Sequence, residues 1–324
     1  MSYIDHFRKV KNINKVLKTV RGEVEQEVKI AVLAEPEVEA EILSILQINE
    51  GNKVVFGLSE VRDEASRKAK LKAADLALVV ISTGKLKDEL DKIAKQALMA
   101  KKKLVIITGR EINEWLVDNL AYVFRVSGED VAFVPLSDVR KIKTTLIPRI
   151  VSKIGDKEVA LGAAVPIFKD EVVSRIIAKT AQQNALIGVA VFIPGADMPL
   201  LTMNQIKMIL RLSAVYNQEL SVKRLYEVLA VVGGGFAFRE AARQIVGTMP
   251  VVGWALKGGV AYGGTIAMGQ LAKRYFESWK GNIENGEETD GETSNGKRAE
   301  TQKSLGAHRA GTSTGGEAEP VHKS

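Results

Sequence analysis

Short apolar runs alternate with amphipathic stretches between residues 28 and 155. Two of these runs, residues 76–81 and 104–107, are continuously apolar, which is typical of strands buried on both faces of a sheet. Such runs, separated by helical patterns, predict an α/β fold with a doubly wound, mostly parallel sheet. The strands are expected in VKIAVLA, KVVFGLS, ADLALVVIS, KKLVIIT and VAFVPLS, which begin at residues 28, 53, 74, 102 and 131.

Residues 1–22 combine apolar side chains at helical spacing with lysine and arginine between them. This spacing predicts a basic amphipathic helix. Two interpretations are open: the helix packs its apolar face on its own domain, or it contacts an anionic lipid surface. The apolar positions are Ile4, Phe7, Val10, Ile13, Leu17 and Val20.

Residues 156–280 lose the strand pattern and predict an all-α, glycine-rich domain. Thr202 and Gln205 have the spacing of a capping box, which predicts a helix start, and Ser221 predicts a second helix cap. Beyond residue 280 the composition turns to Gly, Ser, Thr, Glu, Lys and Asn. A segment with so few apolar side chains cannot offset its ordering entropy, so residues 281–324 are predicted to be a disordered tail.

Small residues recur in the helical domain at a spacing that would let two helices approach closely. The apolar span from residue 245 to 268 approaches the length of a membrane helix, but Pro250 and Lys257 interrupt it. Membrane insertion or tight peripheral binding and a soluble helical bundle are both open. The small-residue stripe is Ala255, Gly259, Gly263 and Ala267, and a glycine run precedes it at Gly233, Gly234 and Gly235.

No phosphate-binding loop of the form G-x-x-x-x-G-K-[ST] follows the first predicted strand. In such a loop the glycines let backbone N–H groups approach the phosphates, and the lysine and hydroxyl serve phosphate and magnesium. Glutamates stand there instead and would repel a triphosphate, so we expect no bound nucleotide and no cofactor. An α/β domain that never had the loop explains the same residues. The degenerate loop comprises Ala34, Glu35, Pro36, Glu39, Ala40 and Glu41.

Composition excludes several kinds of site. Cysteine is absent, which excludes disulfides, thiolate nucleophiles and cysteine–zinc sites. Two of the three histidines, His308 and His322, lie in the polar tail, so we expect neither a histidine triad nor a metal centre. The formal net charge of +7 suits an anionic membrane or nucleic acid, but no nucleic-acid reader motif accompanies it.

Asp197 stands within or beside an apolar segment, where burial would require a partner, as do Asn184, Asn204, Gln205, Arg211, Arg239, Glu240 and Arg243. One hypothesis pairs it with Arg239 or Arg243 to position helices or respond to a ligand. The alternative is turn chemistry and helix capping in the segment PGADMP. No second acid can be linked to Asp197 from the sequence, so we identify no catalytic residue.

Residues 166–278 closely resemble the uncharacterised domain family found C-terminal to Era-like GTPase domains and in YcjF-type bacterial inner-membrane proteins. The segments that carry the resemblance are PGADMPLLTMNQIKMILRLSAVYNQEL, VVGGGFAFREAARQIVGTMPVVGWALKGGVAYGG and TIAMGQLAKRYFES. It implies a bacterial origin and membrane association beside a GTPase or GTPase-like module. The preceding domain, residues 28–155, resembles a degenerate G domain.

These features together predict a non-enzymatic, membrane-associated scaffold or regulatory protein with a G-like domain that binds no nucleotide. Membrane lipid and a protein partner or second copy are the expected partners, and nucleic acid is not expected. The predicted location is the cytoplasmic face of the inner membrane, or the cytoplasm. The alternatives are a soluble interaction protein and a GTPase-like nucleotide binder with an unconventional loop.

Overall fold

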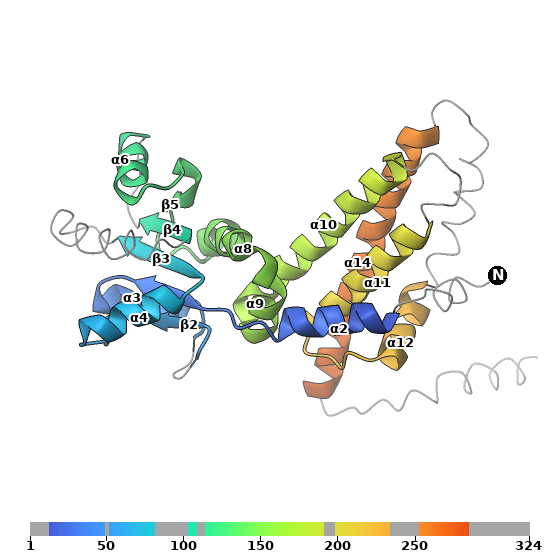
Figure 1. Cartoon of the computed structure of the whole chain (residues 1–324), viewed down its shortest axis with the longest axis horizontal. Coiled ribbons are helices and arrows are strands. Elements are labelled where there is room, and N and C mark those ends of the chain that lie inside the picture. Colours follow the sequence, from blue (N-terminus) through green and yellow to red (C-terminus); the bar gives the residue numbers. More distant parts are fainter. Residues whose placement is uncertain are drawn as a thin grey trace, which may run out of the picture. The chain divides into compact units, whose positions relative to one another are not determined.

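Five parallel strands form the sheet that the apolar runs predict (Figure 1). The computed structural model describes residues 13–48, 52–81, 103–108, 114–190, 198–233 and 253–284. The strand order is β2-β1-β3-β4-β5, an order that doubly wound folds share. The strands are β1 (Ile30–Leu33), β2 (Val55–Gly57), β3 (Leu76–Ile81), β4 (Lys103–Thr108) and β5 (Val131–Phe133). All five fall in the predicted segments.

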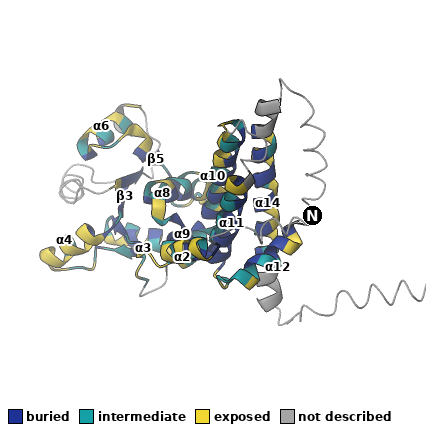
Figure 2. Ribbon diagram, turned by 45° about the vertical axis from the view of Figure 1, so that its right-hand side comes forward, coloured by how far each residue is buried: buried dark blue, intermediate teal, exposed yellow. Residues whose placement is uncertain are grey.

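Both faces of the sheet are covered, which confirms the doubly wound prediction. Successive residues of a strand point to opposite faces, so Val32 and Leu78 join one buried cluster while Leu33 and Val79 join the other. Helices α3 (Pro36–Ile45) and α8 (Ile147–Ile154) contribute to the first cluster. Helices α4 (Glu64–Ala73) and α6 (Glu114–Phe124) contribute to the second, and α4 exposes nearly all of its residues except Leu71 (Figure 2).

Helix α2 (Ile13–Val24) packs on the helical part of its own chain. Its apolar residues Ile13, Leu17 and Val20 are buried in the first cluster, against α9 (Glu158–Ala164) and α11 (Met198–Val215). For residues 13–24 the own-domain interpretation is therefore confirmed, because this apolar face is already covered. The rest of the predicted helix, residues 1–12, lies outside the described residues.

The second part of the chain is helical, as predicted. Besides α9 and α11 it contains α10 (Lys169–Ala190), α12 (Val222–Gly233) and α14 (Gly253–Glu284). Helix α14 continues to Glu284, past the predicted tail start at residue 281. Residues 285–324 lie outside the described residues, so the disordered tail stays a prediction. The described part of the chain also contains short helical turns at η1 (Gly128–Asp130), α7 (Val139–Lys141), η2 (Ile142–Leu146), η3 (Gly155–Lys157) and η4 (Pro166–Phe168).

One of the two predicted helix starts is wrong. Thr202 is buried inside α11, which begins at Met198 and accommodates Pro199 in its first turn. Proline is tolerated there because the first N–H groups of a helix have no intrahelical partner. Ser221 does cap α12, since its hydroxyl accepts a hydrogen bond of 3.2 Å from the Arg224 N–H.

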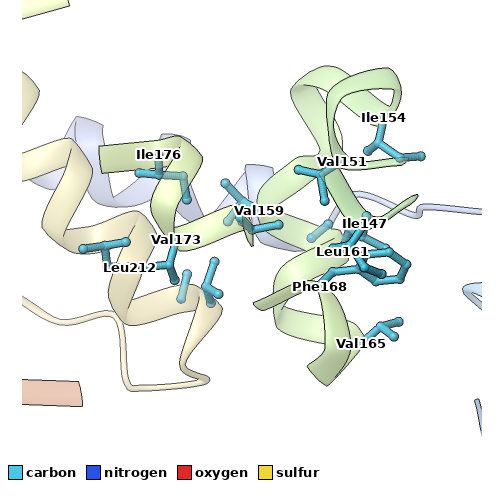
Figure 3. Close-up of a cluster of buried hydrophobic side chains, with 14 of the residues drawn as sticks. Ile147, Val151, Ile154, Val159, Leu161, Val165, Phe168, Val173, Ile176 and Leu212 are labelled. Carbon is cyan, nitrogen blue, oxygen red and sulfur yellow. The ribbon is translucent and has the colours of Figure 1, made fainter. Parts of the chain in front are cut away.

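A single buried cluster contains residues of the sheet and of the helices. Figure 3 shows part of its helical side. The cluster runs from the strands through Ile147 on α8 and Leu161 on α9 to Phe168, which is fully buried. From there it continues to Val173 on α10 and Leu212 on α11. The first compact unit of the chain accordingly extends to Phe276, across the boundary predicted at residue 155.

Candidate functional site

The turn between β1 and α3 is too short to wrap around a phosphate. Only Ala34 and Glu35 separate β1 from α3, and Pro36 is the first residue of the helix. The remaining residues of the degenerate loop therefore lie on the helix itself. Ala40 and Glu41 are exposed, whereas Glu39 is buried, so the glutamates do not converge on one point as the repulsion argument supposed.

Glu39 turns its carboxylate inward, to the loop that follows β2. Oε2 accepts hydrogen bonds from the N–H groups of Leu58 at 2.8 Å and Ser59 at 2.9 Å. The Ser59 hydroxyl donates to Oε1 at 2.5 Å. These are charge-assisted bonds, and Glu39 also lies in the first turn of α3, where the helix dipole favours a negative charge. They compensate the cost of burying a group that is only 4% exposed.

Gly57 makes room for this carboxylate. A Cβ placed on Gly57 would lie 1.9 Å from Glu39 Oε1 and 2.2 Å from Cδ, well inside contact distance. No side chain is therefore compatible with the observed position of Glu39. The sequence indicated neither Gly57 nor Ser59, because a buried acid and the glycine beside it are eighteen residues apart, with no motif to join them.

A hydrogen-bonded chain of side chains joins three helices. Asn184 on α10 is fully buried and donates to the Thr265 hydroxyl on α14 at 2.9 Å. Its own Oδ1 accepts a bond of 2.9 Å from Asn204 on α11. Asn184 and Asn204 are among the polar residues that the sequence places in apolar segments, and the structure supplies the partners that burial requires.

Helix α14 packs on α10 through a different face from the predicted stripe. A Cβ on Gly258 would lie 2.6 Å from Val189, and one on Gly269 would lie 2.6 Å from Ile177, so both glycines permit close approach. Among the described residues, nothing lies within 4 Å of a Cβ on Gly259 or Gly263, and Ala267 is exposed. These three residues of the stripe do not pack on α10, and the stripe stays a prediction as a helix-packing or membrane-contact face. The helix turns Gly258 and Gly269 toward α10 instead.

One end of the helical part carries no charged residue in the helix segments that the structure describes. It consists of the end of α10 (residues 180–190) and the starts of α11 (198–206) and α14 (258–266), and we call it the bundle tip. The contacts of Asn184 with Asn204 and Thr265 bring these segments together (Figure 1). The tip exposes large apolar side chains: Leu186 is 70% exposed, Leu200 54% and Tyr262 40%. None of the helices that the structure describes combines the length and apolar character needed to cross a bilayer.

An ion cluster joins α2 to α11. Arg211 donates to both carboxylate oxygens of Glu23, at 2.7 and 2.8 Å, and Lys207 lies 3.0 Å from the same group. Burial raises the pKa of the Glu23 carboxyl, but the hydrogen bonds and charges of Arg211 and Lys207 outweigh it and leave the pKa below its ordinary value of 4.5. Arg211, another polar residue flagged in the sequence, thus has its partner on the N-terminal helix.

Several predicted site residues lie outside the described part of the chain: Asp197, Arg239, Arg243, Gly234 and Gly235. Gly233 is the last residue of α12, and Ala255 lies in the first turn of α14. Among the described residues, no cluster of His, Asp and Glu could hold a metal ion.

Comparisons with protein-family models, with curated proteins and with solved structures find no match to this chain. The resemblance of residues 166–278 to the domain family of Era-like and YcjF-type proteins stays a prediction.

Proposed function

We propose that this protein is a non-enzymatic, membrane-associated scaffold or regulator whose bundle tip rests in the interface of a bilayer. The observation that carries the proposal is the bundle tip itself, where Leu186, Leu200 and Tyr262 are exposed on helix segments without a charged residue. Exposed apolar side chains on such a surface can enter the boundary between the headgroups and the acyl chains of a bilayer.

The described helices fit a contact at the surface of a bilayer better than a helix that crosses the bilayer. The segments of the tip are short, and each continues into a helix with charged or buried residues. Complete burial of one leucine side chain in an apolar environment contributes about 1.5–3 kcal/mol. Two exposed leucines and a tyrosine, whose hydroxyl suits the headgroup region, are therefore sufficient for reversible binding.

The α/β part is proposed to serve as a binding surface without nucleotide chemistry. Two observations support this part of the proposal. The β1–α3 connection is only Ala34 and Glu35, and the buried carboxylate of Glu39 occupies the backbone donors of the neighbouring loop. Backbone donors that already bind a carboxylate cannot also bind a phosphate.

Vesicle sedimentation of the full-length protein tests the membrane contact. The vesicles consist of phosphatidylcholine with phosphatidylglycerol, and binding is measured at low and at high salt. We expect the wild type to bind in high salt, and the variant with Leu186→Ser and Leu200→Ser to bind at least about tenfold more weakly, because it loses most of the apolar contact. Both leucines are exposed, so thermal stability should stay nearly constant.

The matched control replaces exposed apolar residues of the α/β part, with Val139→Ser and Tyr122→Ser, which are 61% and 85% exposed in the wild type. This variant should bind vesicles like the wild type. If salt alone releases the protein, the contact is electrostatic and the bundle tip is not responsible. If the wild type binds no vesicles at either salt concentration, the membrane role is wrong and a soluble interaction protein is the better description.

A further inference from the structure

The loop after β2 binds an anion that the chain itself supplies. The N–H groups of Leu58 and Ser59 and the Ser59 hydroxyl all point to one carboxylate. Successive backbone N–H groups that converge in this way form a concave site for an anion. The anion comes from Glu39 on α3, so the loop and its ligand belong to different elements of the fold.

We propose that residues 57–59 form an oxyanion-binding site, specific for a carboxylate or phosphate group, which Glu39 fills from within. Gly57 leaves the space in which the carboxylate lies, since a Cβ there would be 1.9 Å from Oε1. The site is at the carboxyl end of β2, and doubly wound sheets bind their ligands at the carboxyl ends of the strands. The inference goes beyond the proposed bilayer contact, because it concerns the α/β part alone.

Glu39 excludes an outside anion in two ways. Its carboxylate takes up the donors and the space, and its charge repels a second anion at short range. The intact protein therefore binds neither free phosphate nor acetate at this loop. Removing the side chain leaves the buried Leu58 N–H and the part-buried Ser59 donors without their acceptor, which favours the entry of a small oxyanion from solution.

Chemical rescue of a full-length Glu39→Ala variant tests the inference. Thermal unfolding is followed with about 100 mM acetate or inorganic phosphate, against chloride at equal ionic strength. We expect the Tm of the variant to rise by about 2–4 °C with acetate or phosphate over chloride, because the anion binds the folded state only. In protein labelled with ¹⁵N-leucine, the amide signal of Leu58 should shift during the same titration. The wild type should show neither response.

Glu37→Ala is the matched control, because Glu37 lies exposed on the same helix and its loss changes the net charge equally. It should show no difference between acetate and chloride. A folded Glu39→Ala protein with no anion-specific rise in Tm and no Leu58 shift would overturn the inference.

If Glu39→Ala does not fold, Gly57→Ala provides a second test of the inference. In the wild-type background the new methyl group displaces the carboxylate and should lower the Tm. If Gly57→Ala instead unfolds at the wild-type temperature, Glu39 is not held in the loop and the inference is wrong. None of these results depends on vesicle binding, so failure here is distinguishable from failure of the bilayer proposal.

Discussion

At the scale of single residues, two carboxylates, Glu23 and Glu158, hold helices together through ion pairs. Glu23 fixes α2 to α11, and Glu158 on α9 lies 2.7 Å from Lys179 and 3.0 Å from Arg175 on α10. Each carboxylate has two cationic partners, which offsets part of the cost of its burial. Losing one member of such a cluster leaves the others without a counter-charge, so substitutions in it should destabilise the fold.

Glu23→Gln should remove part of the acid sensitivity of the protein. The pKa of Glu23 in the folded state is below 4.5, so its ion cluster stabilises the fold above that pH. This contribution disappears as the pH falls through the lowered folded pKa, because the carboxylate becomes protonated. Urea unfolding from about pH 6 downward should therefore show a flatter pH dependence below 4.5 for Glu23→Gln than for the wild type.

The control for this prediction is Glu25→Gln. Glu25 is exposed just after α2, and its side chain makes no ion pair among the described residues. Its loss should leave the pH profile of the wild type unchanged. A Glu23→Gln profile that matches the wild type would show that Arg211 and Lys207 do not lower the pKa of this carboxyl.

At the scale of elements, periodicity located the strands and helices, but it could not say which face of a glycine-rich helix is covered. All five strands lie in predicted segments because continuous apolar runs identify buried strands directly. In α14 small residues occur on several faces, so spacing alone favoured Gly259 and Gly263 over Gly258 and Gly269. Only the positions of Val189 and Ile177 on α10 decide between these faces.

Alanine substitutions on the two faces of α14 should have opposite effects. Gly263→Ala places its methyl group in open space and should stabilise the protein by about 0.5–1 kcal/mol, because alanine favours the helix more than glycine does. Gly269→Ala places the methyl group 2.6 Å from Ile177, which is buried, and should destabilise by about 1–3 kcal/mol. Urea unfolding measures both values. Destabilisation by Gly263→Ala would mean that another segment or a second copy covers this face.

In the candidate sites too, the sequence indicates which residues are unusual, but tertiary packing decides what those residues contact. Missing glycines and lysine after the first strand predict that the phosphate loop is absent, and polar residues in apolar segments pointed to Asn184 and Arg211. The sequence could not indicate the roles of Gly57 and Ser59, because these roles depend on the direction in which the Glu39 side chain leaves α3. That direction is set by tertiary contacts between β2 and α3 rather than by local pattern.

At the scale of the whole molecule, the shared core couples the sheet to the helical part. Leu78 and Val105 in the strands belong to the same buried cluster as Phe168, Ile176 and Leu212. Phe168 lies near its middle, beside Leu161 and Ile147 (Figure 3). A core without a gap between two regions transmits the loss of packing in one to the other, so the two parts should unfold together.

Phe168→Ala should therefore weaken both parts by a similar amount. Removing a fully buried phenylalanine costs about 3–5 kcal/mol, since the cavity closes only partly. Hydrogen exchange monitored by mass spectrometry reports the stability of β3 and of α10 separately. Protection should fall in both peptides, and by about the same free energy, if the chain up to Phe276 unfolds as one unit. A loss of protection confined to α10, with β3 unchanged, would instead identify two domains that unfold independently across a packed interface.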